Sequence, residues 1–148
     1  MEFEVVKVSA ENYSLFQDLV AWRQTGSRQA PACEPISRQI EHELENPNLH
    51  LYAARDPDCF VGWISLVYIP KVGKWGGRGH LYVDELWVAP EYRRRGLGTA
   101  LLAMADRVKT ELRATGIRLY VNIDNPAAQR LYEKSGFLES GQAHFMEK

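Results

Sequence analysis

Hydrophobic side chains recur at helical spacing in four segments of the chain. The strongest pattern covers Leu97–Leu112 and predicts a long amphipathic helix that ends at Gly116. Weaker patterns predict helices over residues 10–24 and 36–44, and a fourth helix over residues 125–135 starts at an Asn-Pro pair and ends before a glycine. The apolar stripe of the long helix consists of Leu97, Leu101, Met104, Ala105, Val108 and Leu112.

Alternating or continuous apolar runs bounded by turn residues predict strands between these helices. The unit that runs from His80–Val88 through the long helix to the next strand should cross over right-handed, which makes its two strands parallel. The expected fold is therefore a mixed α/β sandwich, with a mostly antiparallel sheet flanked by helices. The predicted strands cover residues 3–8, 49–54, 60–69, His80–Val88 and 117–123, and residues 137–148 can add one or two more.

The composition is that of an ordinary globular chain, and its 148 residues predict a single domain over residues 1–148. The 18 Lys and Arg against 19 Asp and Glu leave a net charge of −1, so we expect no nucleic-acid partner and no membrane partner. Short apolar runs and an N-terminus unlike a signal peptide predict a cytoplasmic location. The spacing of Cys33 and Cys59 predicts reduced thiols and no metal site.

The turn between the strand His80–Val88 and the long helix predicts a site for a phosphate or pyrophosphate. A helix N-terminus offers free amide hydrogens and the positive end of the helix dipole. Gly96 and Gly98 would let an anion approach the backbone closely, and the arginines at 93–95 add positive charge. Neither the nucleoside-triphosphate loop nor the dinucleotide fingerprint is present. The alternative interpretation is a solvated arginine turn.

Two motifs in this part of the chain match one known family. Residues 88–102, VAPEYRRRGLGTALL, closely resemble the acetyl-coenzyme A signature Gln/Arg-x-x-Gly-x-Gly/Ala of the GCN5-related N-acetyltransferases (GNAT). Residues 125–137, NPAAQRLYEKSGF, look like the same family's pattern Asn-x-x-Ala-x-x-Leu-Tyr-x-x-x-Gly-Phe. Arg94 departs from the first motif, since many members carry glycine there. The fixed positions of the first motif are occupied by Arg93, Gly96 and Gly98.

The resemblance implies an N-acetyltransferase that uses acetyl-coenzyme A (acetyl-CoA). In the family, the strand before the loop and the strand after the helix splay apart, and the pantetheine arm lies in the gap, bonded to the main chain as if it were another strand. The amides that follow Arg93 would hold the pyrophosphate, which leaves the arginine side chains for outer phosphate oxygens or solvent. The implied cofactor-binding residues are Leu86, Trp87, Val88, Arg93, Arg94, Arg95, Gly96, Leu97, Gly98, Thr99, Asn125, Ala128 and Tyr132.

Direct attack of an amine on the thioester, through a tetrahedral intermediate, needs a base for the amine and an acid for the leaving thiolate. Strand alternation puts Asp84 on one face and Glu85 with Trp87 on the other, each among apolar neighbours, where burial raises the pKa of a carboxyl group. The resemblance favours Asp84 as the base, with Glu85 as the alternative, and Tyr132 as the acid. The structural alternatives are solvated or salt-bridged carboxylates and a tyrosine that only packs against the core.

The acceptor is expected to be a primary amine of a small molecule, a peptide or a protein, and the sequence does not identify it. Acidic residues such as Glu41, Glu43 and Glu45 point weakly to a cationic amine, although they fit the solvated face of the helix over residues 36–44 better. The alternative for the whole chain is a non-catalytic acyl-CoA sensor, which could dispense with Tyr132 and the carboxylates. The oligomeric state stays open, a homodimer included.

Overall fold

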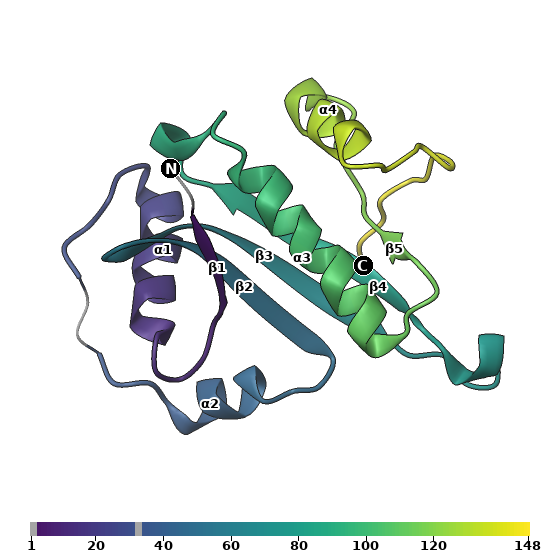
Figure 1. Cartoon of the computed structure of the whole chain (residues 1–148), viewed down its shortest axis with the longest axis horizontal. Coiled ribbons are helices and arrows are strands. Elements are labelled where there is room, and N and C mark those ends of the chain that lie inside the picture. Colours follow the sequence, from purple (N-terminus) through teal and green to yellow (C-terminus); the bar gives the residue numbers. More distant parts are fainter. Residues whose placement is uncertain (1–2, 32–33) are drawn as a thin grey trace.

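The computed structural model describes residues 3–31 and 34–148 (Figure 1). Within these ranges the chain forms a five-stranded sheet in which neighbouring strands are also consecutive in the sequence. The first three strand pairs are antiparallel and the last is parallel, which confirms the predicted mixed fold. The strands are β1 Glu4–Lys7, β2 Leu49–Asp56, β3 Cys59–Ile69, β4 His80–Val88 and β5 Ile117–Arg118.

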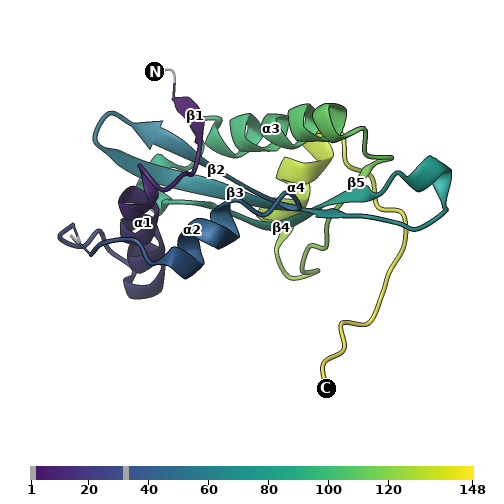
Figure 2. The same ribbon diagram turned by 90° about the horizontal axis from the view of Figure 1, so that it is seen from below.

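Helices cover both faces of the sheet. Figure 2 shows α1 and α2 on one side, which we term the α1 face, and α3 on the other, the α3 face. Among the described residues, no helix is long and apolar enough to cross a membrane. The helices are α1 Tyr13–Thr25, α2 Arg38–Leu44, α3 Leu97–Leu112 and α4 Pro126–Lys134, with two short 3-10 helices, η1 Trp75–Gly77 and η2 Pro90–Tyr92.

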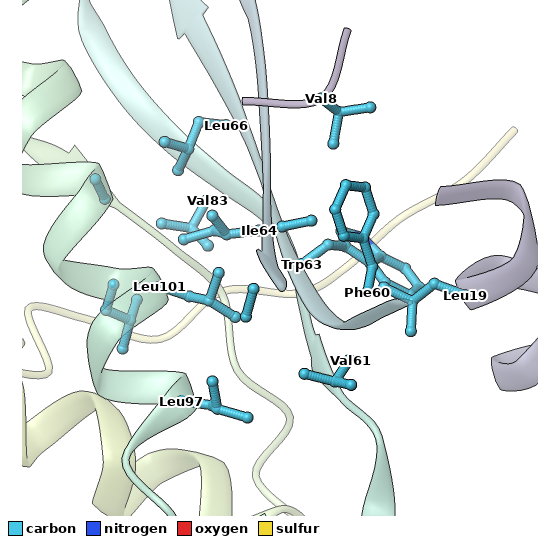
Figure 3. Close-up of a cluster of buried hydrophobic side chains, with 14 of the residues drawn as sticks. Val8, Leu19, Phe60, Val61, Trp63, Ile64, Leu66, Val83, Leu97 and Leu101 are labelled. Atoms are coloured by element: carbon cyan, nitrogen blue, oxygen red, sulfur yellow. The ribbon is translucent and has the colours of Figure 1, made fainter. Parts of the chain in front are cut away.

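The sheet divides the hydrophobic core into two layers (Figure 3). Ile64 and Val83 lie on the same side of the sheet as Leu101 of α3, while Trp63 lies towards Leu19 of α1. All five side chains are at most 4% exposed. Burial of a large apolar side chain stabilises a fold by about 1.5–3 kcal/mol, so these contacts hold α1 and α3 firmly on either side of β3 and β4.

The bounds of α3 agree with the prediction, but the residue that terminates the helix does not. The helix ends at Arg113, which has a φ of 56°, and not at Gly116. Arg113 donates its N–H to the carbonyls near the end of the helix, and its own carbonyl accepts a hydrogen bond from Arg78 Nε at 2.6 Å. The side chain of Arg78, in the β3–β4 connection, therefore bonds a carbonyl at the helix end that has no partner within the helix.

The predicted strands near the C-terminus are mostly wrong. β5 covers only Ile117–Arg118 of the expected 117–123, and residues 137–148 form no strand. Tyr120, Ile123 and Phe145 are 77%, 85% and 88% exposed, so these segments do not pack against the sheet. Strand-forming side chains need cross-strand partners, and β-propensity alone does not supply them.

Candidate active site

β4 has a parallel neighbour over only a small part of its length. It pairs with β5 at Leu81 and Tyr82, and the described residues contain no later pair between the two strands. The rest of β4 is bonded to β3 on its other side. An unpaired strand edge presents N–H and C=O groups to whatever lies beside it. The residues that follow Tyr82 therefore offer main-chain hydrogen bonds to a ligand.

The direction of these groups follows from the antiparallel pairing with β3. The Ala89 N–H donates to the Val61 carbonyl at 2.8 Å, which marks a bonded position of the ladder. Because bonded positions recur at every second residue of an antiparallel strand, Trp87 also directs its main-chain groups towards β3. Leu86 and Val88 direct theirs towards the open edge. Of the three residues expected to bond the cofactor through the main chain, Leu86 and Val88 are thus suitably oriented.

The turn after β4 leads to main-chain amides that lack an intrahelical partner. Gly96 is the N-cap of α3 with a φ of 81°, and no side chain of the described residues caps the helix. The Ala100 N–H donates to the Gly96 carbonyl at 3.0 Å, so the amides of Leu97, Gly98 and Thr99 precede the first intrahelical bond. A β-carbon on Gly96 would meet no atom within 4 Å. This open, electropositive helix end can bind an anion.

Gly98 differs from Gly96 in the space around its α-carbon. A β-carbon at this position would lie 2.8 Å from Leu131 Cδ2, which is too close for an ordinary contact. The missing side chain leaves room for Leu131 of α4 beside the first turn of α3, and the two sequence motifs meet at this point. The open approach expected beside both glycines is found at Gly96.

Two of the three arginines in the turn make contacts within the chain. Arg93 Nε donates to the Val88 carbonyl at 2.9 Å, and the guanidinium of Arg95 lies 5.1 Å from the centre of the Tyr92 ring. Arg94 has a φ of 63°, which gives the turn its left-handed step. All three arginines are exposed, so their positive charges remain accessible to an anion at the start of α3.

The second motif supplies a helix cap and a half-buried tyrosine. Asn125 Oδ1 accepts a hydrogen bond from the Ala128 N–H at 3.1 Å, which confirms the predicted cap of α4. The ring of Tyr132 lies 5.9 Å from that of Phe137, centre to centre. Burial raises the pKa of the Tyr132 hydroxyl, so this group stays protonated at neutral pH. That is the form a proton donor requires.

A β-bulge interrupts the alternation predicted along β4 at Asp84, while Glu85 and Trp87 share a face as predicted. Glu85 pairs with Ser65 and Val83 pairs with Leu66, so Asp84 has no partner on β3. The strict alternation predicted along β4 is therefore wrong at this point. Both carboxylates are exposed, and the burial expected for them is not found. Asp84 makes no hydrogen bond or ion pair with the other residues that the structure describes.

Glu85 forms an ion pair that the sequence pattern did not predict. Arg23 Nη1, in the last turn of α1, donates to Glu85 Oε2 at 2.7 Å, and the guanidinium lies 5.2 Å from the centre of the Trp63 ring. The two partners are 62 positions apart, so no local pattern connects them. The one signal in the sequence is that Arg23 shares a helical stripe with Phe16 and Leu19, where a charged residue needs a partner.

A pocket of about 180 Å³ opens on the α1 face, where α2 and the start of α1 lie against the sheet. Ser65, the β3 residue that pairs with Glu85, lines this pocket. Most of its wall is apolar and includes Ile40 and Leu44 of α2 and Leu51 of β2. We term it the α2 pocket. None of its lining residues belongs to β4, and Ser65 is its link to the strand carboxylates.

A second pocket, of about 200 Å³, lies between α1 and the β2–β3 turn. Trp22 and Cys59 line it, and none of its lining residues belongs to β4. Cys59 is a free thiol, as predicted, and burial raises its pKa. The prediction for Cys33 lies outside the described residues.

A sequence model of the acetyltransferase (GNAT) family matches residues 15–137. The chain belongs to this family. The match extends from α1 to the residues just after α4, and it includes the open edge of β4, the turn before α3 and both sequence motifs.

Two relatives and one solved structure illustrate the range of these acetyltransferases. A mycothiol acetyltransferase of Mycobacteroides abscessus is 29% identical over 80% of this chain and 38% of that protein. NAA20 of Arabidopsis thaliana, the catalytic subunit of the N-terminal acetyltransferase B complex, is 32% identical over 69% of this chain and 64% of that protein. The chain thus spans less than two thirds of either relative. The structure of the aminoglycoside N-acetyltransferase AAC(6')-Iy in complex with CoA matches with a TM-score of 0.76 at 16% identity, covering 98% of both chains, which is a likeness of fold.

Proposed function

We propose that this chain transfers an acetyl group from acetyl-CoA to a primary amine. One observation carries the proposal: the open edge of β4 is followed, after η2 and the arginine turn, by the uncapped first turn of α3. Membership of the acetyltransferase family supports it, as does the CoA complex of an aminoglycoside N-acetyltransferase of the same fold. A single catalytic domain and a cytoplasmic location are part of the proposal.

The residues along this edge fit a molecule of the shape and charge of CoA. The open space at Gly96 and the amides that follow it suit a diphosphate. The Val88 N–H and the main-chain groups of Leu86 can bond the amides of a pantetheine arm, as they would an added strand. The Val88 carbonyl is already bonded to Arg93, so it is less accessible to the arm.

Acetyl-CoA would supply the acetyl group as an activated thioester. The residues of the chain would then remove a proton from the amine and return one to the leaving sulfur. Asp84, exposed at the bulge, is the proposed base, acting directly or through water, and Glu85 is the alternative. Tyr132 is the proposed acid, because it occupies the tyrosine position of the second family motif and its hydroxyl is protonated at neutral pH.

Calorimetric titration with CoA, followed by a thiol-release assay with a panel of primary amines, tests the proposal. We expect CoA to bind with measurable heat and each suitable amine to release free thiol from acetyl-CoA. Binding of CoA without turnover of any amine would indicate a sensor and contradict the enzymatic assignment. Absence of CoA binding would overturn the whole proposal.

A further inference from the structure

Arg23 and Glu85 place opposite charges side by side on the α1 face of β4. Their closest atoms are 2.7 Å apart, and both side chains are 45% exposed. Asp84 directly precedes Glu85 and adds a second negative charge. With a rise of about 3.3 Å per residue, Glu85 lies about 10 Å along β4 from Val88. A pantetheine arm that runs from α3 past Val88 would bring its thioester towards Glu85.

We infer that the acceptor is a free amino acid, an inference that rests on the proposed function. The amine of such a ligand would meet the carboxylates of Asp84 and Glu85, and its own carboxylate would meet the guanidinium of Arg23. Because the two charged groups of the protein are in direct contact, their partners on the ligand must be neighbours too. A 2-aminocarboxylate has this arrangement. A polyamine or an aminoglycoside brings positive charges alone, so it would take Glu85 from Arg23 and offer the guanidinium no carboxylate in return.

The ion pair can exchange one partner for another with little loss of stability. Exposed pairs of this kind contribute about 0–1 kcal/mol, so a ligand can separate them. Arg23 would keep its position through the Trp63 ring, which lies 5.2 Å from its guanidinium carbon. A guanidinium has five N–H donors, and within the described residues the side chain of Arg23 donates to Glu85 alone. Donors therefore remain for a ligand carboxylate.

The α2 pocket favours an amino acid with an apolar side chain. Its wall is mostly apolar, with Lys7 and Glu43 as charged members. Its link to the ion pair is Ser65, the β3 partner of Glu85. Its volume of about 180 Å³ is below the roughly 300–1,000 Å³ of pockets that hold drug-sized ligands. The pocket thus suits a side chain such as that of leucine.

The test compares leucine, leucinamide and spermidine as acceptors in the thiol-release assay. Leucinamide has the same side chain and lacks the carboxylate. We expect kcat/KM for leucine to exceed that for leucinamide and that for spermidine at least about tenfold, which corresponds to the loss of one charge-assisted contact. The amine of leucinamide loses its proton more easily than that of leucine, so leucinamide has the larger share of the neutral amine that attacks the thioester. A preference for leucine therefore cannot come from the basicity of the amine.

Variants of Arg23 separate recognition of the carboxylate from a structural role. Arg23→Gln should bring the leucine to leucinamide ratio close to one, and Arg23→Lys should keep part of the preference. Arg107→Gln is the matched control, because Arg107 forms an exposed ion pair with Glu111 on α3, and its ratio should equal that of the unaltered protein. An unchanged ratio in Arg23→Gln, or a preference for spermidine, would overturn the inference.

Thiol release with amines other than leucine would leave the proposed function intact, whereas release with no amine would contradict that function itself.

Discussion

Leu131 of α4 occupies the space that a side chain on Gly98 of α3 would need. The gap between a β-carbon at Gly98 and Leu131 Cδ2 would be 2.8 Å. This approach is a point where α4 meets the first turn of α3, and Tyr132 is the residue after Leu131. We expect the second glycine of the first motif to act through this packing, in addition to any contact of its amide with an anion.

Gly98→Ala should affect stability differently with and without Leu131. Alanine is the better helix former by about 1 kcal/mol, and overpacking costs about 1–3 kcal/mol. We expect Gly98→Ala to leave the stability unchanged or to lower it by up to about 2 kcal/mol in the unaltered protein, and to raise it in a Leu131→Ala background. Urea unfolding of the four proteins measures the coupling. Equal effects in both backgrounds would show that the contact is unimportant.

Gly96→Ala should weaken CoA binding at least about tenfold, because a methyl group would enter the space in which the diphosphate is expected. The matched control is Gly26→Ala at the end of α1. Both glycines have a positive φ, 81° and 85°, and a β-carbon added to either would meet no atom within 4 Å. Each substitution should lower the stability by about 1–2 kcal/mol. Calorimetry should find weaker CoA binding in Gly96→Ala alone. Equal CoA affinities in the two variants would contradict a diphosphate site at Gly96.

Tyr132→Phe should reduce kcat at least about tenfold and leave CoA affinity nearly unchanged, since it removes a proton donor and keeps the ring that packs on Phe137. The thiol-release assay gives kcat, and calorimetry gives the affinity. Because burial raises the pKa of Tyr132 above the usual value of 10.0, its titration should not limit the rate below pH 10. Full turnover in the phenylalanine variant would leave Tyr132 with a packing role.

Asp84→Asn and Glu85→Gln should have different kinetic effects. Asp84 has no ion-pair partner among the described residues, so its loss should lower kcat at least about tenfold and alter the acidic limb of the pH–rate profile. Glu85 is paired with Arg23, and its replacement should act mainly on KM for the amine. A pH–rate profile unaffected by Asp84→Asn would exclude Asp84 as the base.

Acidification should destabilise the fold through His80, at the start of β4. This side chain is 8% exposed, and burial, followed by the charges of Arg118 and Lys71, lowers its pKa below the usual 6.5. The unfolded chain then binds a proton more readily than the folded one, so stability falls as the pH drops below 6.5. Melting temperatures at pH 7.5 and 5.5 measure the loss, and His80→Gln should reduce it. An equal loss in both proteins would assign the effect to other groups, such as His50, whose pKa burial also lowers.

The elements nearest the site were predictable because their patterns are local. The bounds of β4 and α3 agree with the predictions, since alternation and helical periodicity persist over many consecutive residues in each. The cap of α4 follows from Asn125 and Pro126 in the same way. Strands near the C-terminus could not be predicted, because a strand exists only where another strand accepts its hydrogen bonds.

The sequence by itself determined the family and the presence of a glycine turn before a long helix, because both are properties of consecutive residues. Only the tertiary structure decided the bulge at Asp84, the packing of Leu131 on Gly98 and the pairing of Arg23 with Glu85. The physical reason is the same for all three. Each depends on how a second element lies against the first, and the energy of such a contact does not depend on how far apart its residues are in the chain.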